Sequence, residues 1–252
     1  MPLVADRCIC LRTVEYSETS QVLLLLSREH GLLRVIAKGA HRTTRAGAGR
    51  FGGGIDLLEE GDAVFSDRPE KDLLTLTEWR LREGHLPLRR SLRGLYLGFH
   101  AAELVCSLFE ERDPQPAVFD MLRITLAELA TPRVEQAFVA FQLLVLREAG
   151  LLPQLQTCRS CGQPVASQGR VSFAPALGGV VCRTCEGAQA QRFVIDGRLL
   201  GAVRYMLTLL AGGLTSRLPS LSRAQSDPIN RLLAEHVQYV IGRPLRTARF
   251  VL

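Results

Sequence analysis

Two closely spaced pairs of cysteines constrain this chain more than any other feature. Cys158 pairs with Cys161 and Cys182 with Cys185, each pair in a Cys-x2-Cys pattern, with twenty residues between the pairs. Thiolates at this spacing supply four ligands to one tetrahedral metal ion when the intervening hairpin folds back. Gly162 follows the first pair, where glycine suits the turn beside a metal-bound sulfur. The pattern predicts a ribbon with one Zn²⁺, which is structural because four thiolates leave no open coordination position.

The other three cysteines fit a different role. The total of seven is odd and no signal peptide precedes them, which favours a reducing, cytoplasmic compartment over a secreted disulfide framework. Cys8 and Cys10 lie two residues apart, on one face of a predicted strand, and no further cysteine or histidine is paired with them. We therefore expect them in a core, and we expect Cys106, within an apolar helical pattern, to pack as well.

Several enzyme classes lack their motifs here. None of the five histidines has a glutamate two residues later, as the zinc deaminases require, and the patterns of zinc proteases, phosphate-binding loops and nucleophile elbows are absent from the sequence. The glycine-rich stretch at 49–54 lacks the lysine of a phosphate loop and indicates a flexible turn. The longest apolar run, at 22–26, is too short to span a bilayer. We expect neither an enzyme nor a membrane protein.

Hydrophobic periodicity predicts an α+β chain of several domains. Residues 1–84 contain five short strands separated by turns, which is typical of a closed barrel of the oligonucleotide-binding (OB) type. The period then changes to about 3.6, which predicts an α-helical bundle formed by 85–157 and 188–252. The zinc ribbon, 158–187, is inserted into this helical part. The alternating pattern places Trp79 on one face of a predicted strand, and two roles stay open for it there: packing in the core and stacking on a base.

The distribution of positive charge says more than the net charge of +6. The segment 34–54 contains no acid, and runs of one sign attract phosphate. We expect its cations to contact DNA: Arg34, Lys38, Arg42, Arg45 and Arg50. A second cluster offers Arg89, Arg90 and Arg93, after Arg80 and Arg82, and a third offers Arg243, Arg246 and Arg249. For each cluster the alternative is a solvated face or ion pairs with distant acids.

The order of barrel, helices, ribbon and helices resembles the RecO family of bacterial DNA repair proteins, over nearly the whole chain. Four stretches carry the resemblance: "VEYSETSQVLLLLSREHGLLRVIAKGAHR" at 14–42, "LREAGLLPQLQTCRSCG" at 146–162, "FAPALGGVVCRTC" at 173–185 and "GRPLRTARFVL" at 242–252. The intact cysteine set indicates the zinc-bearing subset of that family. Residues 110–145 match by helical character alone.

The resemblance implies a recombination mediator of the RecF pathway that acts in the bacterial nucleoid. Such proteins bind single- and double-stranded DNA, anneal complementary strands, and act with RecR to help RecA load onto DNA covered by single-stranded-DNA-binding protein. The acidic tail of that protein needs a basic groove, for which Arg192 and Arg204 are candidates by charge. Two alternatives stay open: a zinc-ribbon, OB-fold factor associated with transcription or RNA, and a zinc-dependent nucleic-acid enzyme with an open coordination position.

Overall fold

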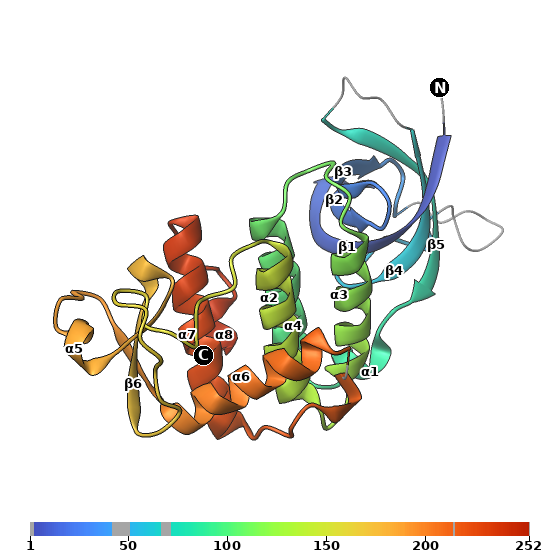
Figure 1. The fold of residues 1–252 in the computed structure, drawn as a ribbon. Coiled ribbons are helices and arrows are strands. Elements are labelled where there is room, and N and C mark those ends of the chain that lie inside the picture. Colours follow the sequence, from blue (N-terminus) through green and yellow to red (C-terminus); the bar gives the residue numbers. More distant parts are fainter. Residues whose placement is uncertain (1–2, 42–50, 67–71, 214, 252) are drawn as a thin grey trace. The chain divides into compact units, whose positions relative to one another are not determined.

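The computed structural model describes residues 3–41, 51–66, 72–213 and 215–251, so Arg42, Arg45 and Arg50 lie outside the described residues. The chain divides into two compact units, Met1–Ala130 and Thr131–Leu252. Each is described by itself (Figure 1). Among the described helices, none combines the length and the apolar character needed to cross a bilayer.

The first unit is built on a closed five-stranded barrel, as the alternating pattern predicts. Its strands are β1 (Leu3–Ser17), β2 (Ser20–Ser27), β3 (Gly31–Ala37), β4 (Glu60–Ser66) and β5 (Leu74–Glu83). They pair in the order β1-β2-β3-β5-β4, and β4 pairs with β1 to close the barrel. Only the β3–β5 pair is parallel. The OB-type barrel expected from the sequence is therefore confirmed.

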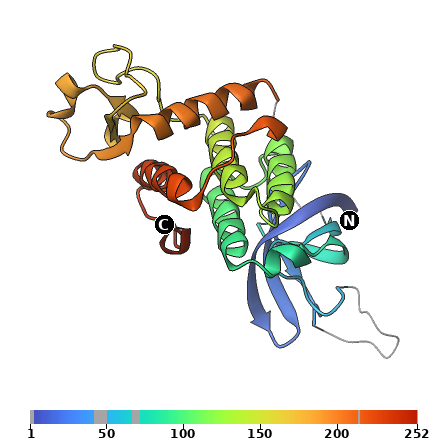
Figure 2. The same cartoon turned by 90° about the horizontal axis from the view of Figure 1, so that it is seen from below.

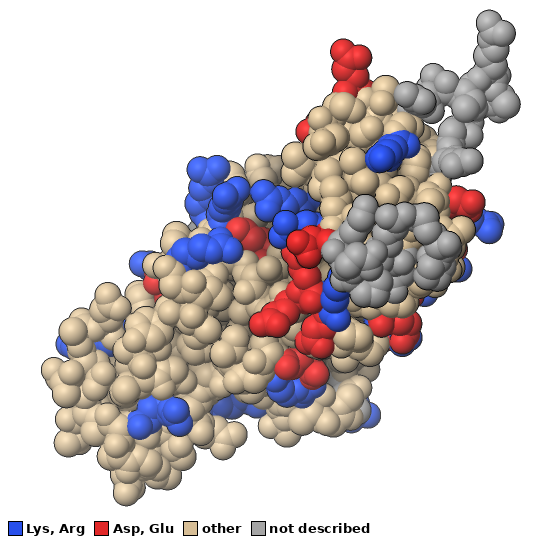
Figure 3. Space-filling model, turned by 90° about the horizontal axis from the view of Figure 1, so that it is seen from above, with Lys and Arg blue, Asp and Glu red and all other residues tan. Residues whose placement is uncertain are grey.

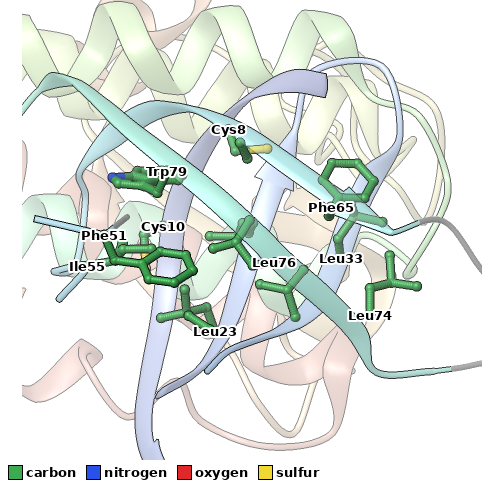
Figure 4. Packing of buried hydrophobic residues seen from close by; sticks show 14 of the residues in the cluster. Cys8, Cys10, Leu23, Leu33, Phe51, Ile55, Phe65, Leu74, Leu76 and Trp79 are labelled. Atoms are coloured by element: carbon green, nitrogen blue, oxygen red, sulfur yellow. The ribbon is translucent and has the colours of Figure 1, made fainter. Parts of the chain in front are cut away.

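Apolar side chains of alternating strand positions fill the barrel (Figure 4). Cys8 and Cys10 are fully buried there, and burial raises the pKa of both thiols well above the usual range. Trp79 is also buried, with 7% of its surface exposed. All three residues belong to the hydrophobic core of the barrel. The indole of Trp79 therefore has no open face on which a base could stack.

Three helices complete the first unit: α1 (Leu86–Arg89), α2 (Leu92–Leu108) and α3 (Pro116–Glu128). Ser91 caps α2, since its hydroxyl accepts from the Gly94 N–H at 3.1 Å. The turn between β2 and β3 is tied to α3 by an ion pair of 2.9 Å between Arg28 and Asp120. The helices thereby attach to the barrel they follow in sequence.

The second unit contains the remaining helices and a small sheet. Its main helices are α4 (Val134–Glu148), α6 (Gly197–Ala211) and α7 (Arg223–Ile241), with short helices α5 (Arg183–Glu186) and α8 (Ala248–Val251). The sheet has the order β7-β6-β8, with β6 at Arg170–Ala174, β7 at Gly179–Val181 and β8 at Phe193–Asp196. Figure 2 shows α6, in orange, leading away from this sheet. The sheet holds the cysteine pairs in place.

Polar contacts fix how α4 and α7 pack. The Ser226 hydroxyl donates to the Glu135 carboxylate at 2.6 Å, and the Gln142 amide donates to Asn230 Oδ1 at 2.8 Å. All four residues are buried. Because an unpaired buried polar group is costly, these contacts allow one register between the two helices and disfavour others.

Candidate metal centre and basic surfaces

The four cysteines of the two pairs converge on one point. Their Sγ atoms all lie within 4.8 Å of one another, and the Sγ atoms of Cys161 and Cys182 are 3.7 Å apart. In a tetrahedral zinc site with Zn–S bonds of about 2.3 Å, the sulfurs are roughly 3.8 Å apart. The arrangement therefore fits one tetrahedral ion bound by Cys158, Cys161, Cys182 and Cys185.

Backbone hydrogen bonds shape each half of the site. In the first pair, the N–H of Cys158 donates to the Gln163 carbonyl at 2.8 Å and that of Gly162 donates to the Cys158 carbonyl at 2.8 Å. Gly162 has φ +76°, a left-handed conformation that favours glycine. The second pair opens α5, and the N–H of Cys182 donates to the Cys158 sulfur at 3.3 Å. This last bond joins the two halves.

The pKa values of these thiols differ from one another because the four sulfurs lie close together. Burial acts to raise the pKa of Cys158, but hydrogen bonds from backbone N–H groups, that of Cys182 foremost, lower it to about 6. The hydrogen bond with the Cys182 thiol raises the pKa of Cys185 to about 12. Four sulfurs this close cannot all be thiolates unless a cation offsets their charge. The donor set therefore suits a divalent metal, and it leaves no position for a reacting water.

At the β7 edge of the small sheet, next to the four cysteines, two backbone segments approach each other closely. Gln154 lies beside β7, where its N–H donates to the Gly178 carbonyl and its carbonyl accepts from the Val180 N–H, both at 2.9 Å. A Cβ on Gly179 would lie 2.5 Å from the Gln154 carbonyl oxygen. Glycine is therefore required at this position for the segment before Cys158 to pair with β7.

Arg204 of α6 fastens the ribbon to the helices. Its guanidinium donates to the Leu155 carbonyl at 2.7 Å, to the Ser167 hydroxyl at 2.6 Å and to the Val165 carbonyl at 3.0 Å. Charge alone suggested Arg204 as a partner for an acidic peptide, whereas these contacts commit its donors to the ribbon. Sequence reasoning missed this role because nothing local marks acceptors 37 to 49 residues away.

The first basic cluster is described only in part. Arg34 is the single exposed residue of β3, and its guanidinium forms an ion pair of 2.7 Å with Glu111. Lys38 follows the strand and is exposed. Although the segment 34–54 has no acid of its own, Glu111 supplies one from far along the chain. A phosphate would compete with that carboxylate for Arg34.

In the second basic cluster, one arginine stabilises the fold and the other two are at least partly exposed. Arg89 is held by Asp56 at 2.8 Å and donates to the carbonyls of Leu57 at 3.0 Å and Gly84 at 3.2 Å, so it contributes to the fold of the first unit. Arg90 is exposed and Arg93 is half-buried. Ion pairs such as that between Arg89 and Asp56 reduce the charge available to a polyanion, and the face drawn in Figure 3 likewise carries both basic and acidic residues.

Comparison with known proteins gives matches along most of the chain. The family model described as "Recombination protein O N terminal" matches residues 1–85, and "Recombination protein O C terminal" matches residues 89–249. The chain is 32% identical over 246 residues to a DNA repair protein RecO from Anaeromyxobacter sp., covering 96% of this chain and 93% of that protein. It is 35% identical over 198 residues to the RecO of Rhodopirellula baltica, covering 78% and 72%.

Proposed function

Because the chain belongs to the RecO family of DNA repair and recombination proteins, we propose that it is a recombination mediator that acts by binding and not by catalysis. It binds single- and double-stranded DNA without reading base sequence, anneals complementary strands, and acts with RecR to help RecA load onto DNA covered by single-stranded-DNA-binding protein. The observation that carries the proposal is the match of both family models, which together extend from residue 1 to residue 249. The closed barrel with Lys38 exposed beside it supports a DNA-binding role.

In this proposal the DNA-binding domain is 1–84, and its contacts are with phosphate. Lys38, Arg42, Arg45 and Arg50 bind the backbone, with Arg34 in support and Arg89, Arg90 and Arg93 as a secondary set. Cations placed between two strands lower the repulsion that opposes their pairing, which is how sequence-independent binding assists annealing. The burial of Trp79 is consistent with binding that does not depend on base stacking at that residue.

The test is a salt series. We would measure the affinity for single-stranded DNA of a Lys38→Ala, Arg42→Ala, Arg45→Ala variant, with Arg147→Ala, Arg198→Ala, Arg223→Ala as a control that removes equal charge from exposed sites of the second unit. Losing three phosphate contacts should lower the slope of log affinity against log salt by roughly two, at about 0.7 per contact. An equal effect of the two variants would refute the assignment. An RNA strand of the same sequence tests the RNA-associated alternative.

The ion pair between Arg34 and Glu111 allows a sharper test, in the direction of gain. Glu111→Gln removes the competing carboxylate and leaves the side chain nearly unchanged in size. If Arg34 supports DNA binding, this variant should bind single strands a few-fold more tightly at low salt, and Arg34→Ala should abolish that gain. No change in affinity for Glu111→Gln would remove Arg34 from the proposed interface.

We also propose that the four cysteines hold one structural Zn²⁺. Metal bound at such sites contributes on the order of 10 kcal/mol to folding in isolated fingers, and less where the surrounding fold already orders the ligands. Metal analysis of protein purified without chelator should give one zinc per chain, and Cys161→Ser, Cys185→Ser should remove it while the barrel stays folded. Cobalt substitution should give the spectrum of a closed tetrahedral thiolate site. An open position would favour the zinc-dependent enzyme instead.

The proposed partners in the bacterial cytoplasm are RecR and the acidic tail of single-stranded-DNA-binding protein. We place the tail on the helical part, 85–157 and 188–252, around the ribbon 158–187. With Arg204 committed to the ribbon, Arg192 remains the basic candidate of the two. Crosslinking of the full chain with RecR and DNA, followed by identification of the linked residues, locates the surface for RecR. Crosslinking of a tail peptide to the full chain tests the placement of the tail, and links confined to residues 1–84 would contradict it.

A further inference from the structure

The two outer edges of the small sheet differ in whether another backbone segment pairs with them. The edge of β7 is covered, because Gln154 bonds to it on both sides of Gly179. β8 is the opposite edge strand, and its outer side has no backbone partner among the residues that the structure describes. An open strand edge is a template for another strand, so proteins normally cover it or use it.

The hydrogen-bond pattern shows which residue of β8 faces outward. The Gly197 N–H donates to the Gly169 carbonyl at 2.7 Å, in register with the pairs between β6 and β8. Hydrogen-bonded and open positions alternate along an antiparallel ladder. Phe193 and Ile195 therefore bond inward to β6, and Val194 directs its N–H and C=O outward. The Val194 side chain is 48% exposed.

A trough lies along this edge. It has a volume of about 700 Å³ and is lined by four consecutive residues, 192–195, and by one face of α7, including Pro228, Arg231 and Leu232. Side chains of a strand alternate between its two faces, so the side chains of one face alone could supply only every second residue of the lining. Since the residues here are consecutive, the backbone edge of β8 forms this wall of the trough. A second hollow of about 590 Å³ shares Arg192, Phe193 and Glu235 with the first and continues to Arg243.

The dimensions suit an extended peptide. The α7 wall from Asp227 to Ile241 is about 21 Å long at 1.5 Å per helical residue, and six or seven extended residues at about 3.3 Å each cover that length. The walls offer apolar contacts at Phe193, Val194 and Leu232. Alternate side chains of an added strand would thus meet an apolar wall.

The charges of the trough favour an acidic partner. Arg192 and Arg231 line it against the carboxylates of Asp227 and Glu235, and Arg243 lines the second hollow that continues from it. Asp227 is already engaged by Arg223, with 3.3 Å between Nε and Oδ2. Nucleic acid fits less well, because a phosphodiester backbone has no N–H to donate to the outward C=O of Val194.

We propose that this trough binds an extended segment of a partner protein, which adds as a strand to β8 and alternates apolar with acidic side chains. The inference goes beyond the proposed contact with DNA and does not depend on it, and it differs from the proposed tail contact, which would use the same Arg192, in needing no free carboxylate. Recognition by the middle of a strand edge needs no chain terminus, so a peptide capped at both ends should bind as well as one with a free carboxylate. Better binding of the free carboxylate would identify a tail-binding pocket instead and overturn the proposal.

The probe is a fluorescein-labelled peptide of eight residues in which valine alternates with aspartate, capped at both ends and followed by anisotropy with the full-length protein. Val194→Pro removes the outward N–H but no bond to β6, and edge strands tolerate proline at such positions. It should weaken binding about fivefold to tenfold, the effect of one lost hydrogen bond. Val194→Thr keeps both the N–H and the branched side chain and should stay within about twofold of the wild type.

A second comparison needs no variant. A peptide N-methylated at every residue has no backbone donor on either of its edges and should bind the wild-type protein at least about tenfold more weakly than the unmodified peptide. Equal binding of the two peptides would overturn strand addition. Replacing aspartate by lysine in the peptide should also weaken binding, and Arg231→Glu should reverse that preference. Loss of DNA affinity in Val194→Pro, with peptide binding intact, would assign the trough to nucleic acid and refute the proposal.

Discussion

Arg204 gives the most stringent test of how the ribbon is held. Arg204→Met keeps most of the length of the side chain but removes its donors, so two backbone carbonyls and the Ser167 hydroxyl lose short hydrogen bonds. Each such bond contributes about 1 kcal/mol net. The guanidinium is only partly buried, and water can replace some of what is lost. We therefore expect the docking of the ribbon onto α6 to weaken by about 2–3 kcal/mol.

This loss should appear in local opening before global unfolding. At 1.4 kcal/mol for each factor of ten, opening of the ribbon should become roughly 30- to 150-fold more frequent. Hydrogen exchange of the amides in 154–167 measures it directly, and the rate of metal release to an excess of chelator should rise with it. Amides of the first unit, such as those of β2, serve as the internal control and should exchange as in the wild type.

Arg204→Lys is the matched variant, because it keeps the charge but offers a single ammonium group where the guanidinium reaches three acceptors. We expect it to lie between the wild type and Arg204→Met. If Arg204→Met exchanged within about threefold of the wild type in 154–167, the contacts would contribute less than 1 kcal/mol and the reasoning would be wrong.

The remaining predictions concern the first unit. Gly31→Ala should destabilise it by more than 1 kcal/mol in chemical denaturation, because φ is +71° and an added Cβ would lie 2.1 Å from the Asp113 carbonyl oxygen. Trp79 is the only tryptophan, so its emission should be that of a buried indole and should not be quenched by oligonucleotide; strong quenching would show a stacked base. Hydrogen bonding to Glu15 raises the pKa of His41, so its stabilising contribution is complete below the unfolded pKa of about 6.5 and is lost as pH rises through the folded value. An NMR titration should show a lower His41 pKa in Glu15→Gln.

Much of this architecture was predictable because its signals are local. Period-two alternation marks the barrel strands, and the change to a helical period marks the helices from α2 onward, because each pattern reflects which face of one element is buried. The cysteine spacing predicted the four-cysteine cluster for a similar reason, since all four residues lie within one segment of 28 residues that folds on itself.

What could not be predicted depends on partners far apart in sequence. β8 is a strand only because β6 pairs with it, and four residues give too short a pattern to be recognised. Arg34 and Arg204 had the same appearance in the sequence, as basic residues open to a polyanion or an acidic peptide. Glu111 in one case, and the carbonyls of Leu155 and Val165 in the other, determine their roles.

The burial of Cys8 and Cys10 makes thiol counting a direct test of the proposed metal content. Their thiols are closed to water and are held protonated by burial, so a thiol reagent meets them only after the barrel unfolds. Cys106 is partly buried, with a pKa raised to about 12, and reacts slowly. Cys161 of the ribbon is exposed, so under the proposal of one structural Zn²⁺ it reacts quickly only in native molecules whose ribbon lacks the metal. Thiol counting at neutral pH, in the native and then the unfolded protein, would therefore report the fraction of molecules that lack the proposed zinc.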